Sequence, residues 1–195
     1  TLYGKLAVSR PPDKGYSGGI KVGIKGLFTA TAEGGYFEHT STGENDRNYT
    51  WGYFSLYVEG SIPLGTSGVF LTNLMGGFYF NCVRPMDPAD PKNSLNNKPT
   101  PQYGIIGIDL GTGLSAGPEK ASIVEGKFTL TVVYDKERNR LTTFLFTGNA
   151  KALAGMVEAK VTLHYQNDDQ DQYLRINITA DAMADASKMA KNATG

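Results

Sequence analysis

Cysteine, histidine and charge are all scarce in this chain. Its 195 residues include one cysteine, Cys82, and two histidines, His39 and His164. One cysteine cannot form an internal disulfide or a thiolate metal cage. Cys82 lies in the aromatic segment Phe78–Val83, so we expect it to be a small buried side chain. Neither histidine has a second histidine at ligand spacing, and no Gly-x-Ser-x-Gly elbow occurs. We therefore expect no catalytic site, no metal site and no cofactor.

Charged residues make up only 19% of the chain, and nineteen basic residues balance nineteen acidic ones. Bulk charge therefore favours neither nucleic acid nor a membrane surface. The longest apolar run is far too short for a membrane-spanning helix. Few cysteines with many Tyr, Asn, Thr and Gly are typical of exported bacterial β proteins, which favours a secreted or cell-surface location and leaves the cytoplasm open. A start at Thr1 without Met suggests a segment of a larger protein.

The chain is rich in glycine and aromatic residues, and it contains stretches in which apolar and polar residues alternate. It has 24 Gly, 11 Tyr and 9 Phe, typical of a sheet protein with tight turns. Four stretches near the C-terminus alternate apolar and polar residues with a period of two, which indicates strands with one face on a core and one in water. These stretches are residues 128–134, 141–147, 157–165 and 173–179. Short polar links join them, so we predict an antiparallel meander.

The N-terminal part predicts further strands, separated by glycine and proline. They are Leu2–Ser9, a strand from Ile20 towards Ala32, Tyr49–Ile62, Val69–Leu74, Phe78–Val83 and Tyr103–Leu110. The pairs Gly34-Gly35 and Gly76-Gly77 are interpreted as breaks, and residues 111–117 as a glycine-rich turn.

Two segments are predicted to lie outside the sheet. Residues 84–102 carry five prolines, which indicates a long exposed loop. Residues 180–193 have high helix propensity and predict a short C-terminal helix. The chain is thus expected to form one all-β domain over residues 1–195, either an antiparallel β-sandwich or an open curved sheet, with a C-terminal meander.

The alternation also predicts a core and a binding face. The apolar residues of each alternating strand share one face, and we expect this face to form the core. The expected core residues are Phe54, Leu56, Val58, Val161, Leu163, Ile176 and Ile178. The opposite face of the strand Tyr49–Ile62 carries an aromatic stripe of Trp51, Tyr53 and Tyr57. Exposed rings on a sheet face can stack on sugars or pack against a protein, whereas a covered face would make the same rings part of a core.

Other motifs are better explained by turns. Residues Gly104–Gly113 (GIIGIDLGTG) resemble the first phosphate loop of the actin-like ATPases, a resemblance of ten residues that would imply nucleotide binding in an α/β fold. Only strands follow here, so we interpret the segment as a strand that ends in a glycine turn. Asp168, Asp169 and Asp171 lack the pattern of a calcium loop and fit a solvated turn.

Three functions remain open. The favoured one is a non-catalytic structural or interaction module of a larger secreted or surface assembly, which acts through sheet faces and edges on a protein partner or a second copy. The alternative is a carbohydrate-binding β-sandwich that uses the Trp51 face on a polysaccharide. The third is a glycoside-acting enzyme, but no glutamates pair at a diagnostic spacing.

Overall fold

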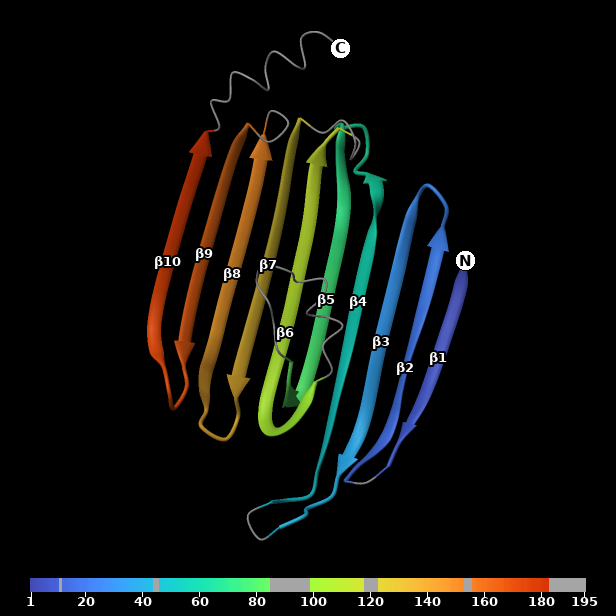
Figure 1. The fold of residues 1–195 in the computed structure, drawn as a ribbon, viewed down its shortest axis with the longest axis vertical. Coiled ribbons are helices and arrows are strands. Elements are labelled where there is room, and N and C mark those ends of the chain that lie inside the picture. Colours follow the sequence, from blue (N-terminus) through green and yellow to red (C-terminus); the bar gives the residue numbers. More distant parts are fainter. Residues whose placement is uncertain (11, 44–45, 85–98, 118–122, 153–155, 183–195) are drawn as a thin grey trace.

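Ten antiparallel strands form a single open sheet, in which every strand pairs with its neighbours in the sequence. The computed structural model describes residues 1–10, 12–43, 46–84, 99–117, 123–152 and 156–182. The strands are β1 (Leu2–Ser9), β2 (Asp13–Ile24), β3 (Phe28–His39), β4 (Tyr49–Pro63), β5 (Val69–Val83), β6 (Thr100–Ala116), β7 (Val124–Asp135), β8 (Arg140–Ala152), β9 (Val157–Asn167) and β10 (Gln172–Ala182). Figure 1 shows them side by side in one layer, with β1 and β10 at the two edges.

The predicted all-β, antiparallel class is confirmed, and the C-terminal meander is the run from β7 to β10. Of the two expected architectures, the described residues form the open sheet and contain no second sheet for a sandwich. Residues 180–182 of the expected C-terminal helix belong to β10, and the remainder lies outside the described residues. Of the expected loop, residues 85–98 also lie outside them, while residues 100–102 open β6.

The predicted glycine breaks are wrong, because both glycine pairs lie inside long strands. Gly35 leaves room for aromatic rings: a Cβ there would lie 2.5 Å from the Phe37 ring and 2.8 Å from the Tyr53 ring. The glycine-rich residues 111–116 likewise continue β6. Glycine therefore serves packing across the strands here rather than chain reversal.

The predicted strand from Ile20 towards Ala32 is also wrong, because it contains a hairpin turn. Gly26 has a φ of 81°, a left-handed conformation that suits glycine, and the backbone N–H of Leu27 donates to the carbonyl of Ile24 at 3.0 Å. The alternation continues in phase across this turn, so the sequence pattern alone does not reveal it.

The expected core lies on the wrong face of the sheet. Phe54, Ile176 and Ile178 are 52%, 57% and 74% exposed. The most buried apolar side chains lie on the opposite face, among them Trp51, Tyr79 and Leu145. We call the face that carries Trp51, Tyr53 and Asp109 the core face, and the face that carries Phe54, Leu56 and Val58 the apolar face.

Candidate functional site

The aromatic stripe lies in and beside the main buried cluster of the core face. Trp51 is 2% exposed and stacks on Phe37, with ring centroids 4.1 Å apart and an angle of 18° between the planes. Tyr53 is half-buried and packs against the same cluster, and Tyr57 is half-buried. The structure thus places Trp51 in the interior, where it contributes to packing.

His39 lies next to this cluster, and carboxylates contact both of its ring nitrogens. Its Nδ1 lies 2.8 Å from Oδ1 of Asp13, and its Nε2 lies 3.1 Å from Oδ2 of Asp46. The Trp51 indole N–H donates to the same Asp13 oxygen at 3.0 Å. The bond to Asp13 raises the pKa of His39, with a further bond to Asp46 and both carboxylate charges acting in the same direction. With both ring nitrogens hydrogen-bonded to carboxylates, His39 joins β3 to Asp13 of β2 and to Asp46 of the following loop.

A polar cavity of about 470 Å³ lies on the core face over strands β5 to β9. Its polar lining comes from strands β6 to β9 and from Arg84, which directly follows β5, and it includes the side chains of Thr131 and His164. Tyr79, Ile105 and Leu145 provide an apolar part of the wall. A cavity of this size matches the small-ligand sites of other proteins.

Arg84 is the most unusual group in this cavity. It is only 4% exposed, and its guanidinium lies 5.2 Å from the centre of the Tyr53 ring. Its Nε, Nη1 and Nη2 atoms have no hydrogen-bond partner among the described residues. A buried cation without a hydrogen-bonded anion is costly, because its lost hydration is not replaced.

Asp109 is buried close to Arg84. Its Oδ1 accepts a hydrogen bond of 3.0 Å from the Thr131 hydroxyl, while its Oδ2 has no partner among the described residues. A Cβ on Gly77 would lie 3.3 Å from this Oδ2 and 3.4 Å from Nη1 of Arg84, so both side chains approach one point on β5. Burial raises the pKa of Asp109 to about 6, although the Thr131 bond and the Arg84 charge oppose the rise.

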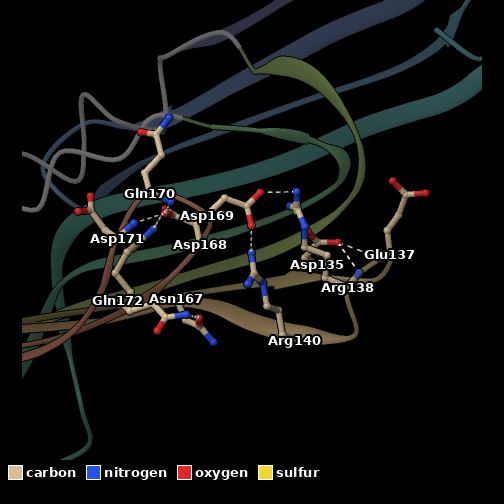
Figure 2. A network of polar contacts seen from close by, with 11 residues as sticks. Asp135, Glu137, Arg138, Arg140, Asn167, Asp168, Asp169, Gln170, Asp171 and Gln172 are labelled. Carbon is tan, nitrogen blue, oxygen red and sulfur yellow. Dashed lines mark hydrogen bonds and ion pairs between the residues drawn. The ribbon is translucent and has the colours of Figure 1, made fainter. Parts of the chain in front are cut away.

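Two acidic residues near the cavity form ion pairs with arginines. Figure 2 shows Arg138 between Asp135 and Asp169, with Arg140 also bound to Asp169. Burial tends to raise the pKa of Asp135, but hydrogen bonds from the backbone and side chain of Arg138 and the backbone of Glu137 outweigh it and leave the pKa below its ordinary value. These contacts tie the β7–β8 turn to the β9–β10 turn, so this cluster is a structural clamp.

Asp168 has a local role, as expected for a turn residue. Its Oδ1 accepts backbone hydrogen bonds of 2.8 Å from Gln170 and from Asp171. A bond from the Gln166 amide, followed by these two backbone bonds, lowers the pKa of Asp168. No group of metal-ligating side chains occurs among the described residues.

Sequence reasoning missed Arg84 and Asp109. Arg84 was assigned to the start of the proline-rich loop, and Asp109 to the end of the strand Tyr103–Leu110 without a role of its own. The sequence does contain an indication that Asp109 is unusual. It is the only charged residue in Ile105–Leu110, and it shares a strand face with Gly107, opposite to Ile108 and Leu110. Cys82, in contrast, is buried as predicted, and burial raises the pKa of its thiol to about 11.

The apolar face carries continuous rows of residues that are in register across the strands. The central row is Leu56, Gly76, Leu110, Leu130, Phe146, Leu163 and Ile176. The rows on either side are Phe54, Phe78, Ile108, Val132, Phe144, Tyr165 and Leu174, and Val58, Leu74, Thr112, Phe128, Gly148, Val161 and Ile178. None of these residues is charged. Many of them are exposed, including Leu110 and Phe78, so the described part of the chain leaves this face open.

No family model, no curated protein and no solved structure matches this chain. Among the described residues, none forms a helix of the length and hydropathy needed to cross a membrane. The function must therefore be argued from the two faces of the sheet and its edges.

Proposed function

We propose that this chain is a non-catalytic interaction module that assembles through its apolar face, with its edge strands as a second contact. The observation that carries the proposal is the open, uncharged apolar face. Contiguous exposed apolar patches larger than a few hundred Å² are rare in monomeric soluble proteins and mark interaction surfaces. On this face, large side chains such as Phe54, Leu110 and Ile176 are half exposed or more.

The size of the apolar face suits a stable interface. The three rows continue across β3, β2 and β1 without a charged residue. Ten strands spaced about 4.8 Å apart and uncharged over about six residue steps define an area of roughly 900 Å². A standard protein interface buries about 800 Å² on each partner. The face is therefore large enough for a stable complex without any additional contact.

The occupant that fits best is the same face of a second copy. Two uncharged faces meet without like-charge repulsion, and the whole chain has a formal net charge of zero, so bulk repulsion is also small. The protruding rings and aliphatic side chains surround Gly76, which has nothing within 4 Å of its Cβ position and offers a recess for a side chain of a facing sheet. A two-fold arrangement uses one surface twice, as in most homodimers.

The edges provide the second contact. Within the described sheet, β1 and β10 each pair on one side only. An edge strand presents unpaired backbone groups that can add a strand from a neighbour. Edge pairing would extend the sheet sideways, whereas face packing would double it, so the two contacts together can build a larger assembly.

Sedimentation equilibrium of the wild type and of Leu110→Lys tests the face contact. Leu110 lies in the central row and is 50% exposed, so a lysine there is tolerated in a separate folded chain but introduces a buried charge at the interface. We expect the wild type to be a dimer or larger at micromolar concentration and Leu110→Lys to be a monomer with an unchanged far-UV spectrum. Gln170→Lys adds the same charge at an exposed turn and should associate like the wild type.

Two results would overturn the face contact. One is a wild type that stays monomeric at all concentrations, and the other is a Leu110→Lys variant that associates as tightly as the wild type. A monomeric wild type that sediments with phosphatidylcholine vesicles would assign the apolar face to lipid instead of to a second copy.

A further inference from the structure

The polar cavity of the core face points to a ligand that the interaction role does not require. A ligand would supply what the described residues do not, namely an anion for Arg84. Arg138 and Arg140 are paired with carboxylates, but the three guanidinium nitrogens of Arg84 are not. Arg84 is also only 4% exposed, so it retains little of the hydration that a surface arginine has.

The geometry around Arg84 selects a carboxylate. The Arg84 guanidinium lies over the Tyr53 ring, and this contact restricts the orientation of its planar set of N–H donors. A restricted guanidinium binds a planar carboxylate through two parallel hydrogen bonds. Asp109 lies nearby but forms no ion-pair contact with Arg84 among the described residues, so its carboxylate compensates only part of the Arg84 charge.

The rest of the cavity wall suits a ligand that has hydroxyl groups and a compact carbon skeleton. Gln102, Thr131 and His164 line the cavity and can hydrogen-bond ligand hydroxyls. Tyr79, Ile105 and Leu145 offer an apolar surface to the C–H face of a sugar ring. The volume of about 470 Å³ is large enough for one monosaccharide unit.

We propose that this cavity binds a sugar acid of the hexuronate type, with the ligand carboxylate on Arg84 and its hydroxyls on the polar wall. The sugar acid can be a free monosaccharide or the end of an acidic polysaccharide. This site is on the core face and is independent of the proposed assembly through the apolar face.

Calorimetric titration with galacturonate and with trigalacturonate tests the proposal and separates the two sources. We expect saturable binding of one galacturonate per chain, and tighter binding of trigalacturonate only if a polysaccharide end is the natural ligand. Galactose lacks the carboxylate and acetate lacks the hydroxyls, so each should bind about tenfold more weakly or worse, as expected for the loss of charge-assisted hydrogen bonds.

Arg84→Met identifies the residue that binds the carboxylate. The variant keeps the apolar stem and removes the charge, so it should fold and lose galacturonate binding by roughly 10- to 100-fold. Arg175→Met removes an arginine from the same face at β10, outside the cavity, and should bind like the wild type. Folding of each variant is checked by its melting temperature, which galacturonate should raise only where it binds.

Three results would overturn the proposal. They are no saturable heat with either sugar acid, equal binding of galactose and galacturonate, and a folded Arg84→Met variant that binds as the wild type does.

Discussion

At the residue scale, the core face holds charged groups where a sheet interior usually holds apolar ones. Asp109 is fully buried with one oxygen bonded to Thr131, and Arg84 lies nearby without a hydrogen bond among the described residues. Buried charge is retained at a cost in stability, so its presence favours a function in binding over one in packing.

The raised pKa of Asp109 makes stability depend on pH. The folded protein holds this proton up to about pH 6, whereas the unfolded chain releases it near the ordinary aspartate value of 3.8. The contribution of Asp109 is therefore fully present below about pH 3.8 and is lost as the pH rises through about 6. The pKa difference of about two units corresponds to about 3 kcal/mol of unfolding free energy.

Asp109→Asn should remove this pH dependence, because an amide oxygen still accepts from Thr131 and does not titrate. Urea unfolding at pH 4 and pH 7.5 measures the difference in unfolding free energy between variant and wild type. That difference should shift in favour of the variant by about 2–3 kcal/mol between the two pH values. A difference that is the same at both pH values would contradict the assigned pKa.

At the scale of strands, glycines on the core face allow large rings to lie flat across neighbouring strands. A Cβ on Gly107 would lie 1.9 Å from Cζ of the Tyr79 ring, and Tyr79 is 1% exposed, so the ring has no free space to move into. This close approach explains why β5 and β6 tolerate glycine in their interiors.

Gly107→Ala should destabilise the fold by about 1–3 kcal/mol, because the added methyl displaces a packed ring. Gly23→Ala is the matched control, since Gly23 lies inside β2 on the core face and its Cβ position has only ordinary contacts, the nearest at 3.5 Å. Alanine there should be neutral or slightly stabilising, by up to about 1 kcal/mol. Equal melting temperatures for the two variants would show that the Tyr79 ring does not need this space.

At the scale of the whole molecule, the sheet has one face that buries charge and another that exposes apolar side chains. Neighbours in the sequence are neighbours in space throughout, so no described strand returns to cover the apolar face. A second molecule is the simplest cover, and the assembly then contributes to the stability of each chain.

The melting temperature should therefore rise with protein concentration in the wild type, because association favours the folded state by mass action. Calorimetric scans over a hundredfold range of concentration measure this rise. Leu110→Lys should melt at one temperature over the same range, and a wild type that also does so would contradict the role of the apolar face.

The site shows where sequence reasoning succeeded and where it did not. Cys82 was predicted to be buried from its aromatic surroundings, and the turn role of Asp168 from residue type alone. Arg84 and Asp109 were missed, because their proximity depends on the register of β5 and β6 and on the glycine at position 77. Residue spacing along the chain contains no information on such cross-strand distances.

The sequence by itself determined the class of the fold and the position of most strands, because alternation with a period of two is local and survives in any antiparallel sheet. It did not determine the hairpin turn at Gly26, since the alternation stays in phase through it. Only the tertiary structure decided which face is the core. Alternation separates the two faces of a strand, but which face is covered depends on the residues that neighbouring strands place beside it.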